Sequence, residues 1–311
     1  MRYYFAPLEG ITDSVYRALH HKYFPGVDRY YTPFISPTVH RSFTQKEKRE
    51  LAPADFTMIP QALTKNAEDF LWLAQQCADI GFEELNLNLG CPSGTVTAKG
   101  KGSGTLRNTE GLDKLLEEIF TASPIPVSIK TRIGFTDPEE FPRLLEIFNR
   151  YPVKELTIHP RTRAAFYNGE VNMDVFSYAV ANSKNPLCYN GNLCNREQIN
   201  TFTAVFPTVQ AVMIGRGLIG DPGMLTPGGT TANKLEQFHD ELLSTYAEVF
   251  GGYRNAMFRI KENWHYWIHR FDGGEKLYKQ LRKATDFNIY QSTARAFFQN
   301  IPFKETFDPK W

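Results

Sequence analysis

Residues 84–104 read ELNLNLGCPSGTVTAKGKGSG, and this stretch decides the fold. Leucines alternate with polar residues over 84–89, which is the period of two that a β-strand requires. A Gly-Cys-Pro sequence centred on Cys91 ends the strand, and the small polar residues after it predict a loop. Reactive groups are often displayed on a loop that follows a rigid strand. We therefore interpret Cys91 as functional, although most free cysteines are buried apolar residues.

The same strand-then-loop pattern recurs along the chain, and stretches with helical periodicity lie between the strands. We predict strands at 3–8, 29–35, 57–63, 84–89, 126–132, 155–159, 186–190 and 211–214. We predict helices at 13–21, 66–80, 109–121, 139–150, 173–181 and 196–206. Eight β/α units predict an α/β fold, a (β/α)8 TIM barrel. A doubly wound open sheet is the alternative, but no GxGxxG follows the first strand.

Composition restricts the class of protein. The 311 residues are 42% hydrophobic and 22% charged, which is enough to bury a large core. Four cysteines occur without a CxxC pair, so we expect no metal site, no disulfide framework and a reducing, cytoplasmic setting. The N-terminus lacks the apolar segment of a signal peptide, and no run of about 18 apolar residues occurs, so we expect no membrane association.

Charge divides the chain into two parts. Residues 1–250 carry 24 basic and 28 acidic side chains, whereas residues 251–311 carry 11 and 6. A Pro/Gly-rich connector follows residue 220, and we predict a catalytic barrel over 1–230 and an all-helical domain over 235–311. Basic and aromatic residues alternate over 254–270, which suits either RNA binding or a helical bundle with buried aromatics. The RNA-binding candidates are Arg259, Lys261, Lys279, Arg282 and Lys283.

Polar residues at the carboxyl ends of barrel strands face one shared mouth, where barrel enzymes place their chemistry. These residues are Pro7, Glu9, Gln61, Asn88, Cys91, Lys130, Arg132, His159, Arg161, Asn190, Gly215 and Arg216. The small polar segments 190–192 and 215–217 follow the seventh and eighth strands, where barrels hold phosphate with backbone N–H groups. We therefore expect a phosphate-bearing ligand in this mouth.

The motifs in this order resemble the tRNA-dihydrouridine synthase family, FMN-dependent enzymes with a barrel and a C-terminal helical domain. The resemblance covers almost the whole chain and rests on APLEGITD (6–13), NLNLGCPSGTV (86–96), VSIKTRIG (127–134), IHPRT (158–162), YNGN (189–192) and VMIGRG (212–217). It implies reduction of uridine to 5,6-dihydrouridine in tRNA, with NADPH reducing a tightly bound FMN. It implies no obligate protein partner.

The resemblance also implies residue roles. Cys91 would give a proton to C5 of the uracil after C6 receives a hydride from reduced FMN. The flavin would be held by Pro7, Leu8, Glu9, Gln61, Lys130, His159, Asn190, Gly191, Asn192, Gly215 and Arg216. Lys130 would stabilise negative charge on the reduced flavin ring. Asn88 would orient the uracil, Arg163 and Tyr167 are candidates for stacking on it, and Lys99 is a further substrate candidate.

Three positions depart from the family pattern. Asn86 stands where Asp is usual, and Gly94 stands where Lys is common, with Lys99 and Lys101 as substitutes nearby. Pro160 replaces a glycine and removes one backbone donor. These departures concern the positioning of the substrate.

Three alternatives stay open at the level of sequence: the same chemistry on ribosomal RNA, a flavin barrel reductase with a small-molecule substrate, and an RNA-binding protein without turnover. The basic C-terminal part disfavours the small-molecule enzyme, which has no use for it. Cys91, Lys130, His159 and Arg216 disfavour the protein without turnover, because all four are present.

Overall fold

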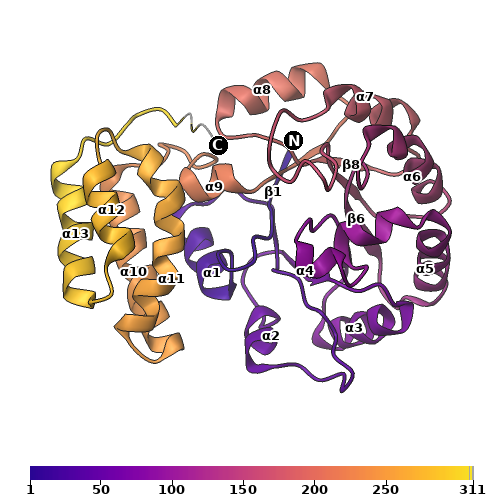
Figure 1. Cartoon of the computed structure of the whole chain (residues 1–311), viewed down its shortest axis with the longest axis horizontal. Helices are drawn as coiled ribbons and strands as arrows, with labels where there is room; N and C mark the ends of the chain where they lie inside the picture. The colour runs from indigo at the N-terminus through magenta and orange to yellow at the C-terminus, as the bar shows by residue number, and fades with distance from the viewer. Residues whose placement is uncertain (308, 310–311) are drawn as a thin grey trace.

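The computed structural model describes residues 1–307 and 309, and it shows a strand barrel ringed by helices, with a group of helices packed on one side (Figure 1). The described residues form one parallel sheet with the order β3-β2-β1-β9-β8-β7-β6-β5-β4. Its strands are β1 (Arg2–Phe5), β2 (Arg29–Tyr31), β3 (Met58–Ile59), β4 (Gln61–Ala62), β5 (Leu85–Leu89), β6 (Val127–Arg132), β7 (Leu156–His159), β8 (Leu187–Tyr189) and β9 (Ala211–Ile214). The predicted TIM barrel is confirmed.

The third barrel strand, predicted as continuous over 57–63, is broken at Pro60. β3 pairs with β2 and β4 pairs with β5, so the two edges of the sheet are halves of one strand. Proline has no N–H to give to a ladder, which explains the break. The second strand ends at Tyr31, earlier than predicted, although Ile35 forms a further parallel bridge to Ala62.

Helices cover the outside of the barrel. They are α1 (Ser14–Tyr23), α2 (Gln45–Glu50), α3 (Ala67–Ile80), α4 (Gly94–Thr97), α5 (Thr109–Ala122), α6 (Phe141–Phe148), α7 (Met173–Asn182), α8 (Arg196–Val205) and α9 (Arg216–Gly220). The longer helices begin after Asp, Asn or Thr caps, as at Asp13, Asn66 and Asn108, whose side chains accept from the first turn. The helix predicted at 139–150 is shorter, because a 3-10 turn (Pro138–Glu140) precedes α6. The sequence interpretation omitted α2, α4 and α9.

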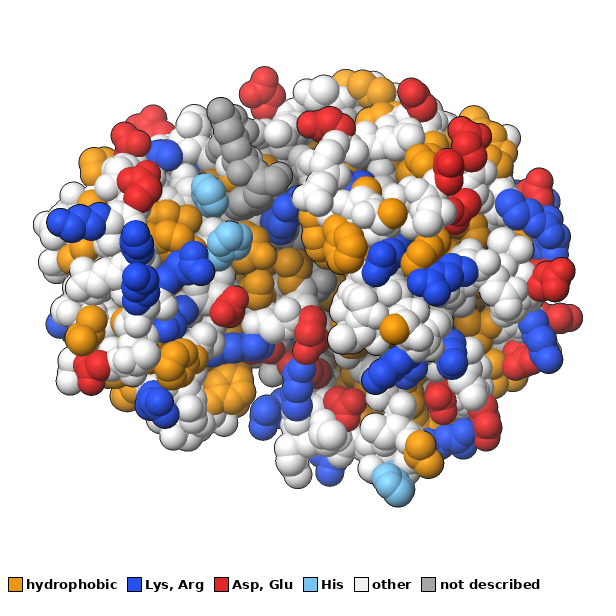
Figure 2. All heavy atoms as spheres, in the orientation of Figure 1, with side chains coloured by type: hydrophobic (Ala, Val, Ile, Leu, Met, Phe, Trp, Pro, Cys, Tyr) orange, Lys and Arg blue, Asp and Glu red, His pale blue; other side chains and the backbone are white. Residues whose placement is uncertain are grey.

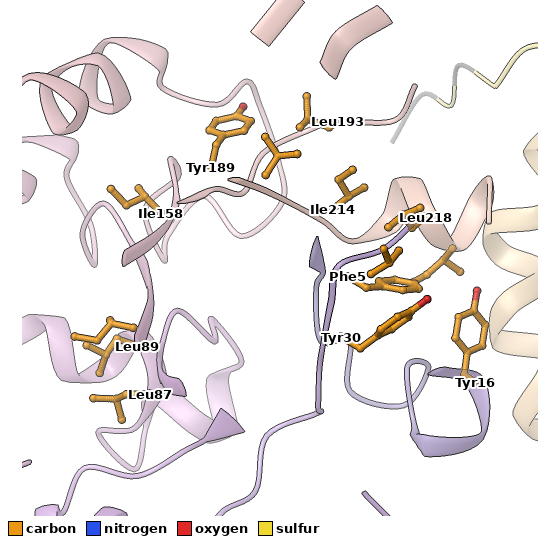
Figure 3. Packing of buried hydrophobic residues seen from close by; sticks show 14 of the residues in the cluster. Phe5, Tyr16, Tyr30, Leu87, Leu89, Ile158, Tyr189, Leu193, Ile214 and Leu218 are labelled. Atoms are coloured by element: carbon orange, nitrogen blue, oxygen red, sulfur yellow. The ribbon is translucent and has the colours of Figure 1, made fainter. Parts of the chain in front are cut away.

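Successive side chains of each strand point to opposite faces, toward the surrounding helices or toward the inside of the barrel. Leu85, Leu87 and Leu89 of β5 belong to the main hydrophobic core, whereas Asn86 and Asn88 point the other way. Figure 3 shows part of this core: Leu87 and Leu89 on β5, and the rings of Phe5, Tyr16 and Tyr30 in another part of the same cluster. Polar side chains therefore occupy the inward positions of β5, whereas a second, smaller apolar cluster that includes Tyr4, Tyr31 and Met213 occupies inward positions of β1, β2 and β9.

The chain from residue 232 onward is helical, with α10 (Ala232–Phe250), α11 (Tyr253–Trp267), α12 (Glu275–Lys283) and α13 (Phe287–Asn300). We call residues 232–300 the helical segment. It starts three residues before the predicted boundary, since Thr231 caps α10. Trp264 and Trp267 are fully buried, so these two aromatics are core residues rather than an RNA-stacking surface.

The barrel and the helical segment share one hydrophobic core. Phe238 of α10 packs edge to face on Tyr16 and Phe24 of the α1 region, and the Trp267 indole N–H donates to the carbonyl of Ile219 at 2.9 Å. The predicted division into domains at residues 230 and 235 stays a prediction. No helix within residues 1–307 and 309 is long and apolar enough to cross a membrane.

Candidate active site

Two adjoining cavities lie at the carboxyl ends of the barrel strands. The outer cavity has a volume of about 410 Å³, which is in the range of small-ligand pockets, and the inner one about 80 Å³. Residues that line both are Pro7, Leu8, Lys130, His159, Tyr167 and Arg216. Gln61, Asn88 and Cys91 line only the outer cavity, and Asn190, Gly191, Asn192 and Gly215 line only the inner one. All of the predicted strand-end residues except Arg161 therefore line one or both of these adjoining cavities.

A relay of amides fixes the side of the outer cavity formed by β4 and β5. Asn88 Nδ2 donates to Gln61 Oε1 at 2.7 Å, and Gln61 Nε2 donates to Asn86 Oδ1 at 2.8 Å. Asn86 Nδ2 then donates to Ser128 Oγ at 2.9 Å. Asn86 stands where the family pattern usually has Asp. Its amide accepts one hydrogen bond and donates another. The orientation of the Gln61 amide toward a ligand is set by this buried network.

The loop that carries Cys91 is held by its main chain. Asn88 Oδ1 accepts from the N–H groups of Gly90 and Cys91 at 3.0 and 2.9 Å, and the Cys91 carbonyl accepts from Ser103 N and Oγ at 3.1 and 2.8 Å. Gly102 packs on this loop with φ +58°, and a β-carbon there would lie 2.9 Å from the Cys91 carbonyl oxygen. The Asn88 amide, which we expected to orient uracil, is engaged in holding this loop.

The thiol of Cys91 is protonated at neutral pH. Burial raises the pKa of Cys91, and a hydrogen bond from the Ser93 main chain together with the charges of Lys130 and Arg132 offsets only part of that effect. A protonated thiol at the wall of a cavity can donate a proton to a bound ligand. It is a poor nucleophile, because nucleophilic attack requires the thiolate.

Positive charge dominates the inner cavity. Burial, followed by the charge of Arg132, lowers the pKa of Lys130 to about 8. Burial and the charges of Arg132, Lys130, Arg161 and Arg216 hold the pKa of His159 well below its ordinary value, so the imidazole is neutral. Among the described residues, no Asp or Glu lines the inner cavity. A site of this kind favours an anionic ligand.

The loops after β8 and β9 are built for close approach to such a ligand. Asn192 Oδ1 accepts from Arg161 Nη1 and from Arg216 Nη2, each at 3.2 Å, and so holds the two guanidinium groups together. Gly191 leaves no room for a side chain, because a β-carbon there would overlap the Tyr189 ring. Backbone that lines the cavity beside two arginines suits a phosphate group. The donor set therefore fits the phosphate end of FMN.

The Arg132 side chain donates hydrogen bonds to main-chain carbonyls of two loops of the site. Its Nε donates to the Gly90 carbonyl at 3.0 Å, and its Nη1 donates to the carbonyls of Thr162 and Phe166 at 2.8 and 2.6 Å. The guanidinium is almost fully buried, and burial lowers its pKa to about 10. The sequence placed Arg132 at the barrel mouth but assigned it no role. It is a positioning residue for the Cys91 loop and for the loop after β7.

Two of the predicted substrate residues lie outside the cavities. Lys99 is exposed on the loop after α4, and Arg163 donates to Thr97 Oγ1 at 3.4 Å while its guanidinium lies over the Phe135 and Phe166 rings. Neither appears among the described residues that line the two cavities. Tyr167, by contrast, lines both cavities. The side chains of Glu9 and Lys46 form an ion pair at 2.6 Å at the rim.

The predicted RNA-binding residues fall into two groups. Arg259 is turned toward the barrel, where Nε and Nη2 donate to Asp13 Oδ2 at 3.0 and 2.6 Å, and Lys261 Nζ donates to the carbonyl of Ala284 at 2.7 Å. Both side chains thus have partners within the protein, and their role in RNA binding stays a prediction. The other three candidates, Lys279, Arg282 and Lys283, are exposed on α12. Figure 2 shows Lys and Arg side chains over the helical segment, at the left of that view.

Sequence interpretation missed several residues of the outer cavity, and two of them, His265 and Tyr266, come from α11. Tyr266 was noted only as one aromatic among several in a basic stretch. The sequence contains no local signal that this helix reaches the barrel mouth. Within residues 1–307 and 309, no group of three His, Cys, Asp or Glu side chains could hold a metal ion.

Comparison with known proteins identifies relatives of this chain. The family model for dihydrouridine synthase (Dus) matches residues 4–305. A probable tRNA-dihydrouridine synthase 1 of Synechocystis is 28% identical over 89% of this chain and 80% of its own length. The tRNA-dihydrouridine synthase B of Pasteurella multocida is 27% identical over 99% of this chain and 90% of its own.

Among solved structures, a morphinone reductase is similar with a TM-score of 0.50 and 12% identity, covering 72% of this chain and 84% of its own. That likeness concerns the fold alone. Because the family model spans nearly the whole chain and the motif residues line one cavity, the chain belongs to the dihydrouridine synthase family of oxidoreductases.

Proposed function

We propose that this protein reduces uridine in tRNA to 5,6-dihydrouridine, with FMN as the bound cofactor and NADPH as the source of electrons. The observation that carries the proposal is the position of Cys91, whose protonated side chain lines the same cavity as Lys130, His159 and Gln61. The names of the relatives support tRNA as the substrate. All four cysteines are free, which is consistent with a reducing cytoplasm.

The cavities offer a set of groups that fits FMN from end to end. Asn190, Gly191, Asn192, Gly215 and Arg216 would hold the phosphate, with His159 beside it. The loop of Pro7, Leu8 and Glu9 and the amide of Gln61 would border the ring system, and Lys130 would face its polar edge. Bound FMN supplies the hydride that reduces C6 of the uracil.

The second half of the reduction is a proton transfer to C5 of the uracil. Cys91 is the donor in this proposal, because its raised pKa keeps the proton on sulfur until the carbon accepts it. Asn88 keeps the donor in position through the Gly90 and Cys91 N–H groups. The uracil must leave its stack to reach the cavity, at a cost of a few kcal/mol that contacts in the pocket offset.

FMN affinity should depend on pH through Lys130. In the protein without ligand, burial and Arg132 lower the pKa of Lys130 to about 8, and an anionic ligand in the cavity raises that pKa again. Above pH 8, Lys130 therefore takes up a proton when FMN binds. The affinity for FMN should stay constant from pH 7 to 8 and should fall above pH 8 by up to about tenfold per pH unit.

Quenching of flavin fluorescence in titrations of apoprotein between pH 7 and 9.5 measures this dependence. Lys130→Met should bind FMN more weakly and without the decline above pH 8, and the exposed Lys99→Met serves as the control. A wild-type affinity that stays constant up to pH 9.5 would contradict the assignment of Lys130.

The exposed basic residues of α12 are the proposed RNA-binding surface. Neutralising Lys279, Arg282 and Lys283 together should reduce the slope of log affinity against log salt by about two to three, since each phosphate contact contributes about 0.7 to 0.9. Filter binding of tRNA across a salt series measures the slope. The matched control is a variant in which the exposed Lys114, Arg143 and Lys184 on the barrel exterior are neutralised. An equal reduction of the slope in both triple variants would refute α12 as a specific RNA-binding surface.

The test of the function itself is optical. The purified protein should be yellow, NADPH should bleach it without oxygen, and unmodified tRNA should restore the colour while dihydrouridine forms. If ribosomal RNA restores the colour and tRNA does not, ribosomal RNA is the substrate. A protein that cannot be loaded with FMN would refute the proposal.

A further inference from the structure

The outer cavity has one wall that does not come from the barrel. His265 and Tyr266 of α11 line it together with Cys91, Tyr167 and Arg216 of the barrel. Tyr266 is half-buried, whereas its neighbours Trp264 and Trp267 are fully buried in the core. Of the three aromatic residues in 264–267, Tyr266 is therefore the one that α11 presents to the cavity.

Polar contacts on both sides of Tyr266 in the sequence fix α11 against the active-site elements. Arg259 forms a two-point ion pair with Asp13, which also accepts from the Tyr246 hydroxyl at 3.2 Å. Asp13 caps α1, directly after the loop that contains Pro7 to Glu9. At the other side, Trp267 donates to Ile219 of α9, the helix that begins at Arg216. The α11 wall is thus tied to two of the elements that form the site.

A second aromatic residue stands on the barrel side of the same rim. Tyr167 is 50% exposed, and the guanidinium carbons of Arg132 and Arg216 each lie 5.3 Å from its ring centroid. Tyr266 lines the outer cavity together with Tyr167 and Arg216, so the three side chains share one rim. The rim therefore has a tyrosine from the barrel and a tyrosine from the helical segment.

We propose that Tyr266 contacts the RNA at a nucleotide that flanks the target uridine and so positions that uridine for the reaction. This inference rests on the proposed function. A cavity of about 410 Å³ is at the small end of ligand pockets, so the flanking nucleotides must lie at its rim. Bases unstacked by extrusion of their neighbour are commonly received by aromatic side chains, with little dependence on sequence.

The test measures how tRNA reoxidises the reduced enzyme. In Tyr266→Ala, the tRNA concentration for half-maximal rate should rise between about fivefold and 150-fold, which corresponds to the loss of one base-stacking contact. Tyr266→Phe keeps the ring and should stay close to wild type. Reoxidation by dissolved oxygen should be unchanged in both, because it needs no RNA. Tyr253→Ala is the matched control, since Tyr253 is a 48% exposed tyrosine on the same helix.

A free mononucleotide separates contact with the strand from disturbance of the cavity. Uridine 5′-monophosphate has no flanking nucleotide, so Tyr266→Ala should impair tRNA reduction much more than reduction of the mononucleotide. An unchanged half-saturating tRNA concentration, or equal losses on both substrates, would overturn the inference and leave the proposed function standing. A wild-type enzyme that tRNA does not reoxidise would overturn both.

Discussion

Replacing Cys91 with alanine is expected to slow dihydrouridine formation by about 10²- to 10⁴-fold, the usual contribution of a positioned general acid. FMN binding should persist, because the main chain of Cys91 is held by Asn88 and Ser103 and does not depend on the thiol. The rate is measured in a single turnover of prereduced enzyme with unmodified tRNA. NADPH reduction of the flavin, followed by absorbance, should proceed at the wild-type rate.

Cys77→Ala is the control for the loss of a thiol. Cys77 is fully buried in α3 and contributes to packing alone, so its replacement should lower stability without changing the single-turnover rate. If Cys91→Ala instead loses its flavin, or reduces uridine at the wild-type rate, Cys91 is not the proton donor.

Arg132→Met is expected to lower the single-turnover rate of dihydrouridine formation by about 10²-fold with little loss of stability. The substitution frees the carbonyls of Gly90, Thr162 and Phe166, and a misplacement of about 1 Å in a catalytic loop has an effect of this size. The stability change should be small because two effects oppose each other. Three carbonyls lose their donor, but a charge whose burial lowers its pKa to about 10 is also removed.

Arg132→Lys distinguishes geometry from charge. A lysine keeps the positive charge but cannot present several donors in a fixed plane, so it should restore little of the rate. Thermal unfolding and the rate should be measured on the same preparations. Full activity in Arg132→Lys would show that charge, and not the positioning of the two loops, is what the reaction requires.

The barrel was predictable because its signals are local. In β5, alternation of leucine with asparagine fixes both the strand and the face that each side chain takes, and turn residues mark its end. The break at Pro60 was missed although the proline is a local signal, because the apolar residues on both sides of it favour one continuous strand. The short helices α2 and α4 were missed as well, since four to six residues are too few to establish a period.

The site was predictable to the extent that it follows strand ends. Cys91, Lys130 and His159 meet because parallel strands bring their carboxyl ends to one mouth. Contacts between distant segments have no such signal. Nothing in the local sequence around Arg259 indicates its ion pair with Asp13, which tertiary packing brings about. The same holds for Tyr266, whose direction is set by the burial of Trp264 and Trp267 beside it.

The continuous core between the barrel and the helical segment has a consequence for how this protein can evolve. Phe238 and Trp267 of the helical segment pack against the barrel. The helical segment therefore cannot rotate relative to the barrel without disrupting their common core. Divergence toward another RNA target must therefore proceed by exchanging side chains on a rigid frame. Descendants that differ in specificity should keep the junction and vary in the exposed residues of α12.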